Sequence, residues 1–314
     1  MPELPELEVI KAILAPRIVG HTVRGAEVSR PYLPQPAELG EHLVGWELSG
    51  IARRGLYLVL SFSSAVHLLL HLTPRVWLWH ERRGSPSTSA TALQLIFDDG
   101  SDLRLIEGRS ARPAGVWVVT SLSSAAPLQK LGHEPLSDAF TAAALRGVIS
   151  GTRRPLKALL TDQTLIAGIG DAYADEILFR AKLSPVRYTH TLAEEEIDRL
   201  WEAIGETLRW AVGEIAVRAG GALFEREIRD FMRVHGRKGL PCPECGAPIA
   251  EILYDAVRTD YCPCCQRAGL SRATVPSKGG RLRRASAPGS PSVHGDGSRP
   301  DRTTPSSEAE TPRR

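Results

Sequence analysis

The chain has 314 residues, of which 42% are hydrophobic and 24% are charged, and its formal net charge is +3. This length allows two domains, and the apolar content is enough for a buried core. No run of about 18 apolar residues occurs, and the N-terminus lacks a basic stretch followed by an apolar one. The sequence therefore excludes a membrane-spanning helix, and we expect neither a secretory signal nor a membrane partner.

Charge is unevenly distributed along the chain. The segment from Arg267 to Arg314 holds ten Lys/Arg and four Asp/Glu, a net of +6, so the preceding part carries about −3. A nucleic-acid partner must therefore be bound by a local basic patch, because no overall positive field attracts it.

The first 130 residues carry the patterns of one helix followed by strands. Just after the opening "MPELPELEVI", apolar residues recur at helical spacing over Leu7–Leu14. Residues 56–72 form two apolar runs around a serine-rich turn, and residues 92–107 alternate around an Asp-Asp-Gly turn, which is a hairpin signal. We therefore predict an N-terminal β-sandwich domain over residues 1–130.

From about Ser137 the apolar spacing becomes helical. The amphipathic segments cover residues 140–150, 154–170, 171–183 and 193–220, and they predict a helical domain over residues 131–235. Residues 268–314 are rich in Ser, Pro, Gly and Arg, which predicts a disordered basic tail. Such a tail is a solvated linker or, as the alternative, a nonspecific phosphate-binding arm.

The five cysteines lie close together, in the stretches "CPEC" and "CPCC". Their odd number and clustering do not indicate a disulfide framework, so a reducing, cytosolic setting is expected. Two C-x2-C pairs at this separation predict a zinc finger over residues 236–267, with one structural Zn²⁺ held by four thiolates. The ligands that the spacing selects are Cys242, Cys245, Cys262 and Cys265, and Cys264 is surplus.

A glycine-rich turn separates two of the helical segments. The stretch "LIAGIGDAYADEILF" places Gly168 and Gly170 where a tight helix-to-helix turn is expected. The next helix starts at Asp171, and its first amide N–H groups would form a phosphate site. The alternative is that Asp171 only caps a helical hairpin.

Three separated features coincide in one order. They are Pro-Glu-Leu-Pro-Glu directly after Met1, the hairpin at residues 160–185 and the cysteine module at residues 242–266. Together they resemble the formamidopyrimidine-DNA glycosylase/endonuclease VIII family over roughly residues 2–267. The resemblance implies an α+β fold with an N-terminal β-sandwich, a helix–two-turn–helix domain and a C-terminal zinc finger. It also implies a bifunctional glycosylase/AP lyase that repairs damaged double-stranded DNA by base excision.

The resemblance gives the first residues a catalytic meaning. In this family the initiator Met is removed and the secondary amine of the next proline, here Pro2, attacks the damaged nucleotide, forms a Schiff base and cuts the strand by elimination. A terminal amine has an ordinary pKa of about 7.7–8, so part of it is nucleophilic at neutral pH. By the same resemblance Glu3 is the general acid/base, Glu6 positions it or relays a proton, and Arg258 grips phosphates around the lesion. The plainer alternative is that Pro2 favours Met removal and the acids favour a helix start.

Further residues match the family's DNA contacts. Lys157 matches a phosphate-contacting lysine, and His71 matches a histidine near the DNA cleft, although it also fits a core position. Either Arg109 or Arg112 can wedge into the duplex. The glycine turn adds Gly168, Gly170 and Asp171 to the expected DNA-binding set.

Departures from the family pattern point to an altered lesion preference. Leu56 stands where the family has a phosphate-binding lysine, and Pro74 stands where it has a wedging methionine. Asp171 replaces an asparagine, and a carboxylate repels a phosphate. The stretch 220–242 is shorter than in 8-oxoguanine-specific members. We therefore expect ring-opened purines, oxidised pyrimidines or bulkier adducts to be preferred over 8-oxoguanine.

Two other functions compete with the enzyme. Leu56 and Asp171 favour a non-catalytic relative that binds damaged DNA, whereas the retained Pro2 and Glu3 favour catalysis. A zinc-ribbon scaffold for RNA or protein is the third possibility. For the enzyme we expect a cytoplasmic, nucleoid-associated monomer.

Overall fold

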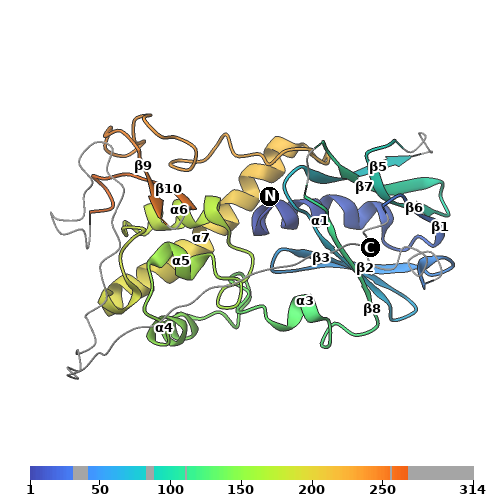
Figure 1. The fold of residues 1–314 in the computed structure, drawn as a ribbon, viewed down its shortest axis with the longest axis horizontal. Coiled ribbons are helices and arrows are strands. Elements are labelled where there is room, and N and C mark those ends of the chain that lie inside the picture. The colour runs from blue at the N-terminus through green and yellow to red at the C-terminus, as the bar shows by residue number, and fades with distance from the viewer. Residues whose placement is uncertain (31–41, 83–87, 110–111, 255–256, 268–314) are drawn as a thin grey trace, which may run out of the picture.

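The structure is a computed structural model that describes residues 1–30, 42–82, 88–109, 112–254 and 257–267. A β-rich part and a helical part lie side by side, and the N-terminus lies between them (Figure 1). This arrangement confirms the predicted α+β class. None of the described helices combines the length and the apolar character that a membrane crossing requires.

The N-terminal part is a helix packed on two antiparallel sheets. After α1 (Leu4–Ile18), the described strands form one sheet in the order β1-β6-β7-β5 and another in the order β2-β3-β4-β8, which confirms the sandwich. The strands are β1 (Val23–Val28), β2 (Leu48–Arg54), β3 (Tyr57–Phe62), β4 (His67–His71), β5 (Val76–Arg82), β6 (Thr91–Phe97), β7 (Ser101–Glu107) and β8 (Gly115–Val119).

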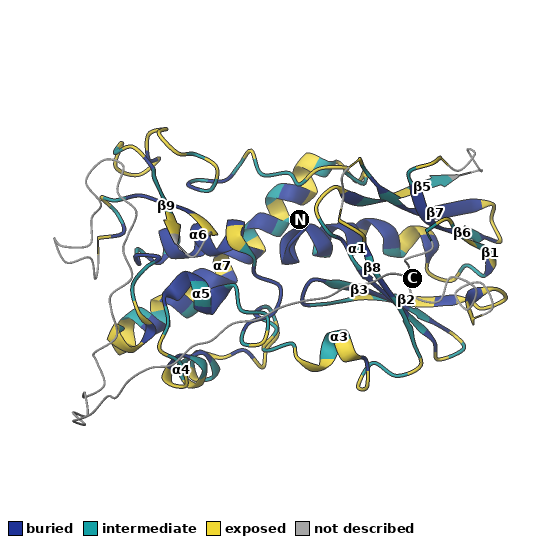
Figure 2. Cartoon of the chain, viewed as in Figure 1, coloured by how far each residue is buried: buried dark blue, intermediate teal, exposed yellow. Residues whose placement is uncertain are grey.

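One apolar core joins the two sheets to α1. The strands bury alternating Leu, Val and Phe side chains, and α1 contributes Leu7, Leu14 and Ile18, each fully buried. Burying a side chain of this size stabilises the fold by about 1.5–3 kcal/mol. The helix that carries the N-terminal acids is therefore held against the sandwich, and Figure 2 shows α1 mostly in the dark blue of buried residues.

The helical part follows a short α3 (Ala126–Gln129). It consists of α4 (Ala142–Ser150), α5 (Leu156–Leu160), α6 (Asp171–Arg180), the 3₁₀ turn η1 (Thr189–Thr191) and α7 (Glu194–Ala219). The helix α7 packs against both α6 and α1. Of the amphipathic segment at residues 154–170, only α5 forms an α-helix.

Side chains explain why α5 ends so early. The Asp162 carboxylate accepts hydrogen bonds from the backbone N–H and the hydroxyl of Thr164, at 2.9 and 2.6 Å. The Gln163 amide donates to the Ile169 carbonyl and accepts from the Gly168 N–H, both at 2.7 Å. These bonds give the backbone partners that a helix would otherwise supply, so a turn forms instead.

Partly buried ion pairs join the sandwich to the helical part. The Glu134 carboxylate contacts Arg53 and Arg54, each at 2.7 Å, and accepts a hydrogen bond from the Gly55 N–H. The Arg53 side chain is 5% exposed and also contacts Glu8 of α1 at 2.8 Å. A buried pair of this kind fixes geometry, because breaking it leaves an uncompensated charge.

The C-terminal module is a β-hairpin of β9 (Ala250–Tyr254) and β10 (Val257–Tyr261), flanked by the cysteines. Phe179 of α6 packs into its small core beside Val234 and Ile249. The predicted basic tail lies outside the described residues.

Two glycines of the helical part, one crowded and one open, test its packing. A Cβ at Gly132 would lie 2.2 Å from the Leu165 carbonyl oxygen, whereas a Cβ at Gly147 in α4 meets nothing within 4 Å. We expect Gly132→Ala to lower the free energy of unfolding by about 1–3 kcal/mol because of overpacking. Gly147→Ala should raise it by about 0.5–1 kcal/mol because alanine favours a helix. Urea unfolding of both variants measures this, and equal effects would contradict the structure.

Candidate active site

The carboxylate of Glu3 lies at the start of α6. It accepts backbone hydrogen bonds from Gly170 at 2.7 Å, Ala172 at 3.1 Å and Tyr173 at 3.3 Å. Glu3 is only 3% exposed. The positive end of the helix dipole stabilises a negative charge at this place, so α6 binds the carboxylate much as helix starts bind anions.

The glycine turn is shaped by this contact. The Gly168 carbonyl accepts a hydrogen bond from the Leu4 N–H at 2.9 Å, and Gly168 has a φ of +94°, which a residue with a side chain rarely adopts. A Cβ at Gly170 would lie 2.5 Å from the carboxyl carbon of Glu3. Both glycines are therefore needed for the N-terminus to approach α6.

Two expectations about this turn need correction. The N-cap of α6 is Gly170, not Asp171, and no side chain of its own caps the helix. The amides expected to face a phosphate are instead hydrogen-bonded to Glu3. Sequence spacing could not show this, because the acceptor is about 170 residues away in the chain.

Glu6 is fully buried behind Glu3. It accepts hydrogen bonds from the Glu3 N–H and the Tyr173 hydroxyl, each at 3.0 Å, and from Arg229 at 3.2 Å. Burial raises the pKa of Glu6 to about 7, while the Arg229 charge acts in the opposite direction. A carboxyl with this pKa can exchange a proton near neutral pH.

The first two residues lie in the same cluster. The Met1 carbonyl accepts a hydrogen bond from Arg229 at 3.0 Å, and the Met1 amine pairs with Glu227 at 2.5 Å. Pro2 is buried and lines a narrow hollow together with Trp77 and Phe224. The structure therefore brings Pro2, Glu3 and Glu6 together at the joint between the two domains.

Two members of this cluster were missed by the sequence interpretation. Tyr173 follows the glycine turn by three residues, so its position in the first turn of α6 was a usable signal. Arg229 lies in the stretch between α7 and the cysteines, where Ile228 and Phe231 pack inward. Other charged residues surround Arg229 in this stretch, so nothing in the sequence singled it out.

Another group of the expected residues meets beside the C-terminal hairpin. The Lys157 ammonium is buried and donates to Asp175 at 2.7 Å and to the Arg258 carbonyl at 2.6 Å. Asp171 lies 3.8 Å from the same ammonium and is mostly exposed. The side chain of Arg258 is exposed on β10. Lys157 therefore ties α5 to α6 and to the C-terminal hairpin.

The remaining candidates lie apart from the carboxylates. His71 ends β4, its ring centre is 5.0 Å from that of Tyr57, and burial lowers its pKa. Arg109 and Arg112 are exposed between β7 and β8. Within the described ranges, no hydrogen bond joins these three side chains to Glu3 or Glu6.

Four cysteines form a candidate metal centre. The Sγ atoms of Cys242, Cys245, Cys262 and Cys265 all lie within 4.8 Å of one another. Cys264 is exposed and lies outside this group. Four converging thiols are the donor set of a structural metal site.

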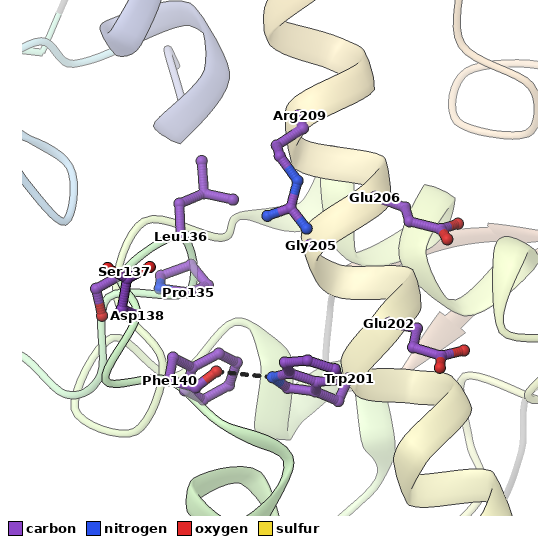
Figure 3. Close-up of a pocket in the computed structure, with 10 residues that line it drawn as sticks. All are labelled: Pro135, Leu136, Ser137, Asp138, Phe140, Trp201, Glu202, Gly205, Glu206 and Arg209. Atoms are coloured by element: carbon purple, nitrogen blue, oxygen red, sulfur yellow. Dashed lines mark hydrogen bonds between the residues drawn. The ribbon is translucent and has the colours of Figure 1, made fainter.

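A separate hollow of about 330 Å³ lies between the segment 135–140 and α7 (Figure 3). Its wall is closed by the Trp201 indole, which donates to the Phe140 carbonyl at 2.7 Å. Glu202 and Glu206 point away from Phe140 in this view. The hollow therefore lacks converging acid–base groups, unlike the cluster at Glu3.

Buried carboxylates, a phenol and a guanidinium around a chain terminus define an enzyme of the acid–base type. Comparisons with known proteins agree. The family model for the formamidopyrimidine-DNA glycosylase N-terminal domain matches residues 1–112, and the model for the H2TH domain of the same enzymes matches residues 131–220. The chain belongs to the formamidopyrimidine-DNA glycosylase family, and it is a DNA glycosylase of base excision repair.

Individual relatives cover most of the chain. A formamidopyrimidine-DNA glycosylase from Geobacillus kaustophilus is 35% identical over 279 residues, which are 85% of this chain and all of that protein. The crystal structure of MutM (Fpg) from Thermus thermophilus is similar with a TM-score of 0.72 and 35% identity, covering 86% of this chain and all of that one. Lactococcus lactis Fpg in complex with DNA containing FAPY-dG has a TM-score of 0.76 and 28% identity, covering 84% of this chain and all of that one.

The glycine turn offers a direct test of the site. Gly170→Ala forces the Glu3 carboxyl away from the start of α6, because the new Cβ would lie 2.5 Å from it. A displacement of about 1 Å at a catalytic group costs roughly a hundredfold in rate. We therefore expect base excision to fall by about that factor. The control is Gly151→Ala at the end of α4, where the nearest atom is 3.6 Å away. Equal rates for the two variants, in single-turnover assays, would contradict this placement of Glu3.

Proposed function

We propose that the protein excises damaged bases through a Schiff base formed by Pro2 after removal of Met1. The observation that carries this proposal is the docking of residues 2–6 against the start of α6, with Glu3 bound by three amides. That contact holds the chain terminus beside buried acids at the joint between the domains. Attack of the Pro2 nitrogen on C1′ expels the base and leaves an iminium. Loss of the C2′ proton then breaks the strand by elimination.

The two acids take different parts in this reaction. Glu3 acts at the sugar as general acid and base, since it is adjacent to the nucleophile and nearly buried. Glu6 accepts hydrogen bonds from the Glu3 backbone and from Tyr173, so it orients the start of α1 and relays protons. Its pKa of about 7 suits that exchange at neutral pH.

The substrate we propose is damaged double-stranded DNA, bound by a monomer. Relatives of similar fold are described in complexes with DNA that contains FAPY-dG or an abasic site. Arg258 is placed to grip phosphates from the zinc-finger side, and His71, Arg109 and Arg112 are assigned to the sandwich side of the duplex. Lys157 contributes mainly by positioning Asp175 of α6 and β10, because its ammonium already has protein partners.

Ring-opened purines, oxidised pyrimidines or bulkier adducts remain the favoured lesions. Leu56 is buried in the turn between β2 and β3, so it offers no charge to a phosphate. The alternative is a non-catalytic relative that only binds damaged DNA. We place the protein in the cytoplasm, close to the nucleoid, because both its DNA substrate and its reduced cysteines fit that compartment.

We propose that the four clustered cysteines hold one Zn²⁺. Their Sγ atoms converge within 4.8 Å, which fits four thiolate ligands on one tetrahedral ion. The ion supplies folding energy to the β9–β10 hairpin and takes no part in the chemistry. Arg258 on β10 depends on that fold for its position.

Borohydride trapping on a duplex with one abasic site tests the nucleophile. Reduction of the iminium should link the protein to DNA, and peptide mapping should place the link at Pro2. We expect Pro2→Gly to reduce trapping at least about tenfold, because a less basic, less rigid amine replaces the proline. The control is Lys11→Met, which removes a nearby amine that pairs with Glu8 on α1. Absence of any adduct with Met-free protein supports the non-catalytic alternative.

Zinc removal tests the metal assignment. Chelation should unfold the hairpin, because the binding free energy of such a site is folding free energy. We expect one zinc per chain by elemental analysis and at least a tenfold loss of affinity for an uncleavable abasic-analogue duplex. Cys245→Ser should lose both the zinc and the affinity for the duplex, while Cys264→Ser should lose neither. Unchanged affinity after complete metal loss would show that Arg258 is wrongly placed.

A further inference from the structure

Arg229 reaches the catalytic centre from a segment that has no recognised motif. Its guanidinium donates to Glu6 at 3.2 Å, to Glu3 at 3.3 Å and to the Met1 carbonyl at 3.0 Å. The two carboxylate side chains are 0% and 4% exposed, and that of Arg229 is 24% exposed. One planar cation therefore bridges two nearly buried acids, an arrangement to which the fixed fork of an arginine is suited.

The segment around Arg229 is anchored on both sides. Ile228 and Phe231 pack against Val9 of α1 and Ile215 of α7. The Phe231 ring also meets Trp210 edge-on, with ring centres 5.2 Å apart. Arg229 is therefore held in place by packing, and its reach toward the acids does not depend on their attraction alone.

Hydrogen-bond direction shows which charge state the site is built for. The groups that face Glu6 are the Glu3 N–H, the Tyr173 hydroxyl and Arg229, and all of them donate. A charged Glu6 accepts from all three groups, whereas a protonated Glu6 can donate only to the Tyr173 hydroxyl oxygen, so the surroundings favour the charged form. Desolvation acts against the charge of Arg229, yet Glu3 and Glu6 outweigh it and raise the pKa of Arg229, so the guanidinium stays charged.

We propose that Arg229 is a positioning residue of this enzyme: it holds the Glu3 and Glu6 carboxylates at fixed places beside the nucleophile and balances their charge. This role rests on the proposed Pro2 chemistry. It differs from a phosphate-gripping role, because the guanidinium is directed to the acids. Loss of Arg229 leaves Glu6 beside Glu3 without that opposite charge, so the pKa of Glu6 rises above its present value of about 7. At neutral pH a larger fraction of Glu6 is then protonated, and the acid limb of the rate profile moves to higher pH.

The test is the single-turnover rate of strand cleavage against pH, on a duplex with one abasic site. We expect Arg229→Met to shift the acid limb upward by about one pH unit and to lower the rate at pH 7 by roughly tenfold. Arg229→Lys should restore the charge but not the fork, so its limb should lie between the two. Affinity for an uncleavable abasic-analogue duplex should change less than about threefold, because no phosphate contact is lost.

The charge-matched control is Arg146→Met on α4. Arg146 pairs with Glu194 and Asp198 and contacts neither catalytic acid. Its pH profile should equal that of the unmodified protein. The proposal is overturned if the acid limb does not move in either Arg229 variant. It is also overturned if a variant loses affinity while its acid limb stays in place. If Arg229→Met does not fold, Arg229→Lys alone decides, since its limb must still move. Absence of a borohydride adduct with the unmodified protein is a different result, because it removes the Pro2 chemistry itself.

Discussion

The whole proposed catalytic arrangement depends on one shared carboxylate. Glu3 opens α1 and at the same time binds three amides at the start of α6, in the other domain. Neither helix could supply this partner by itself, because the first amides of a helix have no acceptor within it. The bond therefore fixes the chain terminus in space only when both domains are docked.

Docking has a cost that the surrounding residues offset. Burying two carboxylates side by side is unfavourable unless donors and an opposite charge surround them. Amides at the start of α6 donate hydrogen bonds to Glu3, whereas Tyr173 and Arg229 donate to Glu6. The Glu134 pairs with Arg53 and Arg54 then hold the two domains at the distance that these short contacts require.

Local patterns in the sequence predicted much of the fold, because turns and cysteine pairs depend on residues that are close together in the chain. The Asp-Asp-Gly hairpin between β6 and β7 and the Gly168–Gly170 turn follow from spacing within a few residues, and the cluster of four cysteines follows from two C-x2-C pairs. The early end of α5 did not, since side-chain bonds of Gln163 compete there with an otherwise helical pattern. Arg229 could not be found by spacing either, because its partners lie more than 220 residues away.

One departure from the family pattern, Leu56, changes the charge near the centre. Leu56 is buried in the turn after β2, and the neighbouring Gly55 carbonyl lies about 3.3 Å from where a Cβ of Gly168 would be. This side of the centre is thus packed and apolar where the resemblance led us to expect a lysine. The positive charge that contacts Glu3 and Glu6 comes from Arg229, in the segment that follows α7. The charge of a cation held by two acids is already compensated, so Arg229 positions the two carboxylates and contributes less to binding DNA phosphates.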